Sequence, residues 1–430
     1  MSYVASVNYS YDDKYYASFS FRRDGSSRLS PDTRWGNFWS LSASWRLSQE
    51  RFMQPLKSVL SDLKLRASYG VNGNLPSSYY GYQSTYTTGA FYSGKPSPWE
   101  STLGNEELTW EKNYALNLGL DIGLFSRVNV SLDWYTRTTK DLLMSKQLNS
   151  ISGFSSLLTN VGQMRNTGVE LEVRSNNIKT KDFSWTTAFN LSHNKNKILK
   201  LADLPWFVDG RYVRKEGYPF NTIYLREYAG VGPETGSALY YDNQQDENGN
   251  YTKNKVTDPG QASPIPLKDI TPTISGGFMN TFNYKFIDLS FNLSYSFGGY
   301  SYDNASYILQ DDGYSVISNK STEQRRRWQK PGDITDVPRF VYGNKKGGNY
   351  NSSRAIHSTD HIRLKSLILG LNAPKAWLQK LGIGNARIYF SGTNLLTWAA
   401  YDQYDPEMSG VVGFYTPPLK TYAFGLELKF

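Results

Sequence analysis

Few residues in this chain have the chemistry for catalysis or metal binding, and the histidines are the first to consider. The chain contains three histidines and no cysteine, which excludes disulfide bonds, thiolate metal sites and cysteine nucleophiles. His357 and His361 are four residues apart, the spacing that places two zinc ligands on one face of a helix. Ser358 stands where a metalloprotease motif requires glutamate, and the surroundings are typical of a loop. We therefore interpret both as polar loop residues before a strand, and His193 receives no role.

Two further segments are similar to ligand-binding loops without matching them. Residues 230–236 look like a dinucleotide-binding fingerprint, but the segment is one residue too long, contains Pro233 and lacks a βαβ context. Residues 246–250 carry the acidic residues of a calcium loop, but the glycine is misplaced and no late glutamate completes it. We predict a loop at 230–236. A polar turn is the favoured interpretation of 246–250, and a calcium site is the alternative.

Ligand contact is the chemistry that remains. The many acidic residues contain no pair that the sequence singles out for glycoside hydrolysis, and we expect no enzymatic activity. No catalytic residue, cofactor-binding residue or metal ligand is assigned. Aromatic side chains in the long loops suit sugar rings and apolar peptide side chains, but packing between loops is the alternative role for each, so the substrate-binding residues stay unassigned. These loop aromatics are Trp35, Tyr79, Tyr80, Trp99, Trp206 and Tyr212.

The composition narrows the class of protein. Aromatic residues make up 15% of the 430 residues, yet the mean hydropathy is −0.54. No stretch approaches the ~18–20 apolar residues of a spanning helix, and disordered chains are depleted in aromatic residues. The net charge is +9, but the basic residues are scattered, and the one dense run, Arg325–Arg327, lies in no nucleic-acid-binding motif. We expect a folded chain with no helical membrane span and no nucleic-acid partner.

Apolar residues recur at every second position in segment after segment, which is the pattern of a strand with one apolar face. In 287–297 every odd position is apolar or aromatic, and the even positions are Asp, Ser or Asn. Segment 361–373 is the least regular, because its apolar residues change phase midway. The sequence predicts thirteen strands, at 3–11, 15–25, 38–48, 62–74, 109–124, 127–144, 161–175, 182–200, 273–285, 287–304, 361–373, 385–398 and 418–430.

The connections between these strands alternate between short and long. A tight turn at 12–14 is typical of one set, and the loops 75–108, 202–272 and 305–360 belong to the other. Transmembrane β-barrels sort their connections in this way, with short periplasmic turns and longer extracellular loops, whereas sandwiches with Greek-key crossovers do not. The predicted fold class is therefore all-β, an antiparallel up-and-down transmembrane β-barrel. Segments 49–60 and 374–381 have apolar residues at helical spacing, and we expect one- or two-turn helices there.

A barrel in lipid requires an apolar outer face and permits a polar inner face, because every backbone group must pair within the sheet. Charged strand residues such as Arg66 and Asp121 should face the lumen, since a charge at the lipid midplane costs ~2–4 kcal/mol. Two sets of opposite sidedness follow: Leu118, Leu132, Trp134, Leu289, Phe291, Leu293, Phe424 and Leu426 outward to lipid, and Asn117, Asp133, Asn292 and Glu427 inward.

Short motifs are spread along nearly the whole chain, at 21–27 (FRRDGSS), 63–70 (LKLRASYG), 160–170 (NVGQMRNTGVE), 271–278 (TPTISGGF), 326–328 (RRW), 362–367 (IRLKSL), 391–398 (SGTNLLTW) and 404–407 (YDPE). In this order they resemble the C-terminal half of SusC/RagA-type TonB-dependent receptors of the Bacteroidetes outer membrane. The closing Phe430 is similar to the aromatic C-terminal residue that is read during assembly of outer-membrane proteins.

The resemblance implies a barrel of 22 strands with an N-terminal plug domain in its lumen. It implies a nutrient importer in the outer membrane of a Gram-negative cell, surrounded by outer-membrane lipid and driven by TonB. The implied ligand is an oligosaccharide or a peptide, and the implied partner is a SusD-like surface lipoprotein. TonB would be contacted through an N-terminal region that has no counterpart in this sequence.

Other parts of the family pattern are also missing, and we expect residues 1–430 to be the C-terminal part of one incomplete barrel domain. The signal peptide, the plug and about nine strands have no counterpart, and the sequence from Met1 reads as a strand in progress. Complete bacterial single-chain barrels have an even number of strands, so strands 3–11 and 418–430 should each present an unpaired edge. A passive or structural outer-membrane barrel, such as a porin or an adhesin translocator, is an alternative function, and a soluble all-β glycan-binding protein is another.

Overall fold

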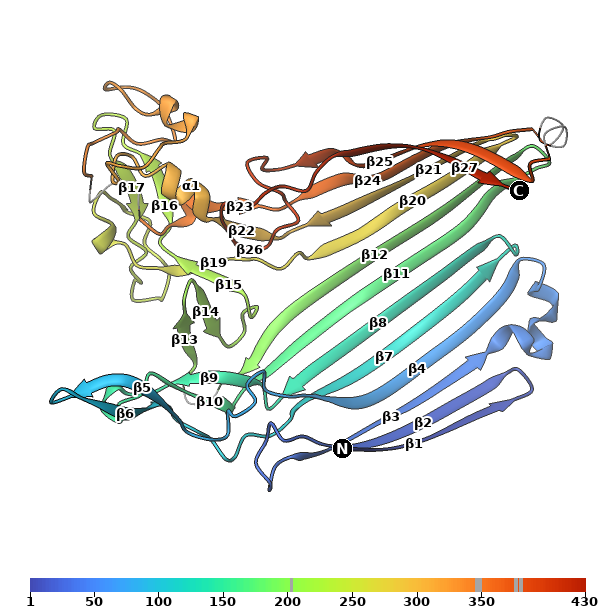
Figure 1. Ribbon diagram of the computed structural model, residues 1–430, viewed down its shortest axis with the longest axis horizontal. Helices are drawn as coiled ribbons and strands as arrows, with labels where there is room; N and C mark the ends of the chain where they lie inside the picture. The colour runs from blue at the N-terminus through green and yellow to red at the C-terminus, as the bar shows by residue number, and fades with distance from the viewer. Residues whose placement is uncertain (202–203, 345–349, 375–377, 379–381) are drawn as a thin grey trace. The chain divides into compact units, whose positions relative to one another are not determined.

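The computed structural model describes residues 1–201, 204–344, 350–374, 378 and 382–430. Thirteen long strands form one sheet and follow each other in chain order (Figure 1). The neighbours from β1 to β12 and from β24 to β27 pair antiparallel. The predicted strands and their up-and-down order are therefore confirmed. These strands are β1 Ser2–Tyr11, β2 Tyr15–Gly25, β3 Trp35–Arg46, β4 Leu60–Asn74, β7 Glu111–Leu124, β8 Val128–Lys140, β11 Gln163–Lys179, β12 Phe183–Lys200, β20 Ile274–Tyr284, β21 Ile287–Phe297, β24 His361–Asn372, β25 Asn385–Ala399 and β27 Thr421–Lys429.

The described residues divide into two compact units. The first unit comprises Met1–Trp206, Lys215–Phe220 and Gly276–Asp288. The second unit comprises Phe207–Arg214, Asn221–Ser275 and Leu289–Phe430. Strands β1 and β27 are the two end strands of the sheet order, and they are not neighbours in it, as the odd strand number predicts.

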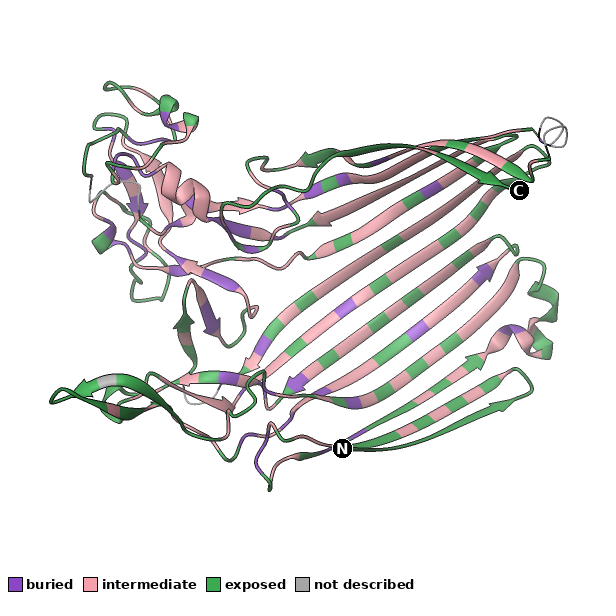
Figure 2. Ribbon diagram, in the orientation of Figure 1, coloured by how far each residue is buried: buried purple, intermediate pink, exposed green. Residues whose placement is uncertain are grey.

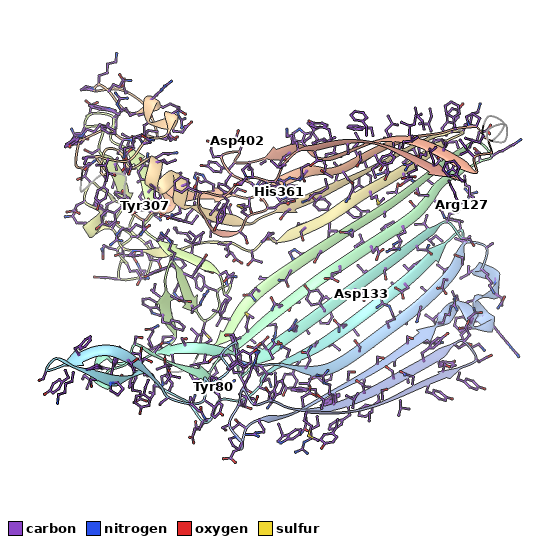
Figure 3. The ribbon with its side chains drawn as sticks, viewed as in Figure 1. Tyr80, Arg127, Asp133, Tyr307, His361 and Asp402 are labelled. Atoms are coloured by element: carbon purple, nitrogen blue, oxygen red, sulfur yellow. The ribbon has the colours of Figure 1, made fainter. Side chains whose placement is uncertain are left out.

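Short turns and long loops lie at opposite ends of the first unit. Asp12 and Asp13 both have left-handed backbones, with φ of 51° and 52°, and Lys14 N donates to Tyr11 O at 3.0 Å, which closes the short turn 12–14. Because neighbouring strands are antiparallel, the loop 75–110 lies at the other end, and the chain leaves β12 at that same end. Arg127, beside a short turn, and Tyr80, in a long loop, mark the two ends in Figure 3. Loops 75–108 and 202–272 therefore leave the sheet at the same end, as predicted.

The long loops contain short strands that the sequence did not predict. They form small sheets of their own, with β15 paired to β19, β16 to β17, and β22 to both β23 and β26. One short helix, α1 Asn304–Leu309, follows β22. The short strands are β5 Thr85–Tyr92, β6 Lys95–Thr102, β9 Leu143–Gln147, β10 Ser156–Asn160, β13 Trp206–Asp209, β14 Tyr212–Lys215, β15 Thr222–Leu225, β16 Tyr228–Val231, β17 Ala238–Tyr241, β18 Lys255–Val256, β19 Ile265–Asp269, β22 Tyr300–Asp303, β23 Ile356–Ser358 and β26 Gly410–Val412.

Two predicted strands run across a break in the observed chain, and a left-handed residue explains each break. The predicted strand 127–144 stops at Lys140, because Asp141 has a φ of 55° and starts a separate strand, β9. The predicted strand 287–304 stops at Phe297, because Gly298 has a φ of 82° before β22 begins. A left-handed residue interrupts the extended backbone, and at these two positions the strand ends.

The phase change predicted in 361–373 is a β-bulge. The register of β24 against β25 shifts between Leu364 and Ser366, and on β25 it passes over Asn394, which has a left-handed φ of 53°. One extra residue reverses the faces on which later side chains lie. His361 and Arg363 are accordingly buried before the bulge, while Leu369 and Leu371 are exposed after it.

The helix predicted at 49–60 is only partly present. Two 3₁₀ turns, Leu47–Gln49 and Arg51–Leu56, replace it. Glu50 between them is extended, and its carboxylate accepts hydrogen bonds from Tyr15 Oη at 2.6 Å and Trp45 Nε1 at 3.2 Å. This tether to β2 and β3 interrupts the helix. The helix predicted at 374–381 lies outside the described residues, apart from Pro374 and Leu378.

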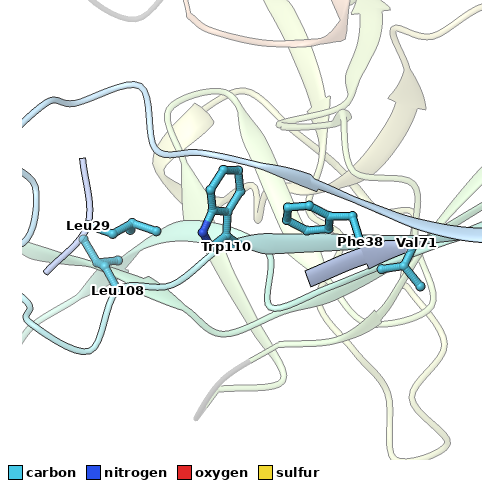
Figure 4. Close-up of a cluster of buried hydrophobic side chains, with 5 residues drawn as sticks. All are labelled: Leu29, Phe38, Val71, Leu108 and Trp110. Atoms are coloured by element: carbon cyan, nitrogen blue, oxygen red, sulfur yellow. The ribbon is translucent and has the colours of Figure 1, made fainter. Parts of the chain in front are cut away.

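Burial follows the strand period instead of a central core (Figure 2). All ten residues of β1 are exposed, and Leu118, Leu132, Trp134, Phe424 and Leu426 are exposed as well. The buried cluster of the first unit lies at the loop end of the strands, where Leu29 and Leu108 from loops meet Phe38, Val71 and Trp110 (Figure 4). Among the described residues, no helix is long and apolar enough to cross a membrane.

Candidate functional site

One face of the first unit carries an arginine bridging two carboxylates. Arg66 of β4 bonds through Nε to Asp121 of β7 at 2.8 Å, and through Nη1 to Asp133 of β8 at 2.9 Å. Ser131 Oγ donates to Asp121 on the same face. Period two places all four side chains on one side of the sheet, and Asp133 lies midway along its strand in Figure 3.

A glycine makes room for this cluster. A Cβ atom on residue 119 would lie 2.5 Å from Asp133 Oδ1 and 2.6 Å from Arg66 Cζ. Only glycine therefore leaves the space in which the guanidinium can reach both carboxylates. The cluster therefore depends on side chains from three neighbouring strands and on the absence of a side chain at Gly119.

The same face is hollowed in two places. One hollow of about 430 Å³ is lined by Ser18, Ser42, Ser68 and Asn117, together with Arg66 and Asp133. A second, of about 480 Å³, is lined by charged residues from Arg46 to Arg174. Hydroxyl, amide and charged groups can bind water and polar solutes. This face agrees with the predicted inward set, in that Asn117 and Asp133 line a hollow while Leu118 and Leu132 do not.

The second unit holds a buried ion pair among its loops. Arg354 bonds to both carboxylate oxygens of Asp312, at 2.5 Å and 3.2 Å, and Gln324 Nε2 donates to Asp312 Oδ1 at 2.9 Å. The Asp312 side chain is completely buried. Burial raises the pKa of the Asp312 carboxyl, and the guanidinium opposes this rise. A pair of this kind holds three separate loop segments in one geometry.

The motif 404–407 holds a loop in place. Asp405 and Glu407 both bond to Arg363 of β24, at 2.8 Å and 3.0 Å, and Glu407 also bonds to Lys365 at 2.6 Å. Tyr404 bonds to Ser301 of β22. These bonds hold the loop between β25 and β27 against the long strand β24 and against the small sheet that contains β22.

The histidines do not form a metal site. His357 lies in β23 and stacks on Tyr401 with ring centroids 3.7 Å apart, while His361 begins β24 and bonds through Nδ1 to Thr359 O at 2.7 Å. Both are on extended backbone, so the helical spacing is not used. The interpretation as loop residues before a strand is wrong, because His357 lies within a strand and the buried His361 is the first residue of one. In the part of the chain that the structure describes, no group of three or more histidines and acidic residues could hold a metal ion.

The two loop segments singled out in the sequence are turns. Residues 232–237 form the turn of the β16–β17 hairpin, with Gly236 N donating to Gly232 O at 2.7 Å. The loop predicted at 230–236 is therefore confirmed from Gly232 on, whereas Gly230 and Val231 end the strand β16. In 246–250, Asp246 Oδ1 accepts the backbone N–H groups of Asn248 and Asn250 at 2.9 Å and 2.8 Å. This is the predicted polar turn.

The six loop aromatics do not converge on one site. Tyr79 lies under the guanidinium of Arg28 at 4.2 Å, a contact between loops. Trp35 was placed in a loop from the sequence, but it is the first residue of β3 and stacks on Tyr3. Its ring is therefore stacked on a side chain from another strand of the same sheet. The remaining four are spread over separate elements: Tyr80 in the loop before β5, Trp99 in β6, Trp206 in β13 and Tyr212 in β14.

Known proteins share this architecture. The family described as "TonB dependent receptor-like, beta-barrel" matches residues 2–260. The chain is 33% identical to "TonB-dependent receptor P3" of Formosa agariphila, with 100% of the chain and 45% of that relative covered. It is 31% identical to "TonB-dependent receptor SusC" of Bacteroides thetaiotaomicron, with 100% of the chain and 44% of that relative covered.

Solved structures give the same result. The "Structure of the RagAB peptide transporter" matches 100% of the chain and 47% of its own, with a TM-score of 0.90 and 31% identity. The RagAB peptide importer in the "closed-closed" state matches with a TM-score of 0.88 and 31% identity. The chain spans about half the length of the curated relatives that it matches. Since the family covers more than half of the residues and the fold agrees over the whole chain, this chain belongs to the TonB-dependent receptor-like β-barrel family.

Proposed function

We propose that the chain is the C-terminal barrel part of a TonB-dependent receptor that imports a nutrient across the outer membrane of a Gram-negative cell. The observation that carries the proposal is the thirteen-stranded sheet in chain order, with exposed apolar residues alternating with a polar, hollowed face. Lipid would cover the apolar rows, because hydrocarbon accepts only a sheet whose backbone is fully paired. The polar face would line the lumen.

The substrate class that we propose is an oligosaccharide or a peptide. The motif resemblance implies either ligand, and similarity to a structure described as the RagAB peptide transporter supports the peptide. The partners that we propose are a SusD-like surface lipoprotein at the loop end and TonB at the other. TonB would act through a region outside residues 1–430, together with a plug domain. In this proposal residues 1–430 are one barrel domain.

A passive pore is the second candidate, because a polar, hollowed wall would serve diffusion as well as driven import. A soluble glycan-binding protein is disfavoured, since rows of exposed Leu, Trp and Phe side chains on the strands would form a large apolar surface in water. Dependence on TonB distinguishes driven import from a passive pore.

The test is uptake by cells that produce the whole receptor containing this chain. Labelled oligosaccharides and peptides of graded length are supplied to a strain with TonB and to the same strain without it. We expect uptake of one class to stop when TonB is deleted, and to stop when the protonmotive force is collapsed. Uptake that continues unchanged without TonB would identify a passive pore and contradict the proposal.

A further inference from the structure

The loop between α1 and β23 contains a segment, residues 322–343, with five basic and three acidic residues, which we call the basic arm. Arg325, Lys330 and Arg339 are exposed, and within the described residues no carboxylate lies at ion-pair distance from any of them. Arg326 differs, because it pairs with Glu323 at 2.5 Å and with Asp336 at 3.5 Å. Arg325 and Arg339 therefore present charge that no carboxylate pairs within the described residues, whereas the charge of Lys330 acts on Asp333.

The backbone of the arm is fixed by its neighbours. Trp328 N donates to Val337 O at 2.9 Å, so that the two halves of the arm lie side by side. The indole Nε1 of Trp328 donates to Pro233 O at 2.7 Å, and its ring fills the space that a Cβ on Gly236 would need. A fixed backbone reduces the entropy lost when a ligand binds the arm.

The base of the arm is the buried ion pair described above. Gln324, within the arm, donates to Asp312, which in turn is held by Arg354. Val341 N donates to Asp312 O at 3.1 Å at the far end of the arm. Both ends of the arm are therefore anchored on one buried carboxylate residue.

Aromatic rings open to solvent follow directly after Arg339. Phe340 and Tyr342 are 43% and 79% exposed, and Tyr314, in the neighbouring segment, is 50% exposed. Gly343 N donates to Gly313 O at 2.8 Å, so the backbone next to Tyr342 lies against the backbone next to Tyr314. Exposed rings therefore follow the cation Arg339 directly in the chain.

We propose that the basic arm binds an acidic oligosaccharide, with its guanidinium and ammonium groups on carboxylate or sulfate groups and its exposed rings against the sugar rings. Arginine presents a planar fork that matches the oxygens of such anions. This inference rests on the proposed function, because it names the chemistry of the imported ligand. The Arg run still gives no reason to propose a nucleic-acid ligand, because this surface contains cations and rings but no element that could enter the groove of a nucleic acid.

An acidic peptide is the competing ligand, and the backbone of the arm disfavours it. Extended peptides bind by adding a strand to a free sheet edge. Here the N–H groups of Arg339, Val341 and Gly343 are already bonded to residues 236, 312 and 313. The arm instead presents charged side chains and exposed rings, which suit an acidic sugar.

The test measures binding by the whole purified receptor in detergent, using isothermal titration calorimetry. The probes are hexagalacturonate, a sulfated hexasaccharide, maltohexaose as the neutral sugar, and hexaglutamate as the acidic peptide. The variant is Arg325→Gln with Lys330→Gln and Arg339→Gln. The control variant is Arg51→Gln with Lys57→Gln and Lys181→Gln, which removes the same charge from exposed residues of the short connections.

We expect the native receptor to bind at least one acidic sugar, with an affinity that falls as salt is raised. The arm variant should bind it at least tenfold more weakly, while the control variant binds it as the native protein does. Tyr342→Ala should weaken binding by a smaller factor. Unchanged thermal unfolding of the arm variant would show that the loss is not a folding defect.

Three results would overturn the inference: no binding of either acidic sugar, equal binding by the arm variant and the native receptor, or tighter binding of hexaglutamate or maltohexaose than of both acidic sugars. Calorimetry does not involve TonB, so this test and the uptake test fail separately. A receptor whose uptake ignores TonB but whose arm binds acidic sugar would contradict the proposed function alone.

Discussion

The long strands and the loops of the second unit are stabilised in different ways. In the strands, few side chains are buried, and β1 has no buried residue at all. In the loops, side chains such as Tyr240, Tyr302 and Val337 are fully buried, and so are Asp303, Asp311 and Asp312. Figure 2 shows alternation along the strands and continuous buried stretches in the loops.

This difference shows what the stability of each region depends on. The strands have paired backbones but an uncovered apolar face, so their stability depends on what surrounds that face. The loops carry their own cores, and these include ion pairs such as Lys320 with Asp311 and Arg354 with Asp312. Removing one partner of a buried pair leaves an uncompensated charge, which is far more destabilising than losing an exposed pair.

The largest effect is expected for Arg354→Met. The substitution leaves the Asp312 carboxylate buried without its cation, which costs ~3–5 kcal/mol for a buried pair. We expect the loops of the second unit to open while the long strands stay folded. Hydrogen exchange should show lost protection in 310–343 and native protection in β24 and β25. The double variant Asp312→Leu with Arg354→Met should recover most of the protection. Equal protection in Arg354→Met and the native protein would show that the loops do not depend on this pair.

The next largest effect separates the two faces of a strand. Leu118 and Asn117 are neighbours on β7, both exposed, and on opposite faces. Leu118→Arg places a charge on the apolar face and should lower the free energy of unfolding by ~2–4 kcal/mol in lipid. Asn117→Arg, on the hollowed face, is the matched control and should have little effect. Urea unfolding of the whole receptor in vesicles measures both. A larger effect at residue 117 would reverse the sidedness that we propose.

The same comparison explains what could be predicted from sequence. The thirteen strands and their order were predictable, because one apolar and one polar face impose a period of two on every strand. The fit fails where a single residue breaks the extended backbone: Asp141 and Gly298 have left-handed φ angles, and nothing in the periodicity marks them. Glu50 broke a predicted helix through contacts with other strands, which local spacing does not contain.

The candidate sites were predictable to a smaller extent. Arg66, Asp121 and Asp133 could be assigned to one face from period two, but the ion-pair cluster and the need for Gly119 appear only when three strands are paired. In the loops, residues that meet are far apart in the chain, such as Asp312 with Arg354. No local pattern marks a buried loop charge. The Arg run of the basic arm was visible, but which of its charges are paired was not.

A smaller effect is expected at Gly119. Gly119→Val adds atoms where a Cβ would already lie 2.5 Å from Asp133 Oδ1. The clash should separate Arg66 from the carboxylates and lower the free energy of unfolding by ~1–3 kcal/mol, as overpacking does. Urea unfolding measures the loss. Adding Asp133→Ala should relieve the clash and recover part of it. If Gly119→Val is as stable as the native receptor, this face of the sheet tolerates repacking, in contrast to the loops.

The smallest effect is a pH dependence confined to the loops. His357 is mostly buried against Tyr401, and burial lowers the pKa of its imidazole, although Asp303 opposes the shift. The folded loop therefore favours neutral His357, while the unfolded chain binds a proton near the ordinary pKa of 6.5. Stability from this group is complete above that pH and is lost as pH falls below it.

Hydrogen exchange in β22 and β23 should accelerate between pH 7.5 and 5, whereas exchange in β7 and β8, corrected for the intrinsic pH effect, should not. His357→Phe keeps a ring against Tyr401 and should remove the pH dependence. Acceleration of equal size in His357→Phe would assign the titration to another group.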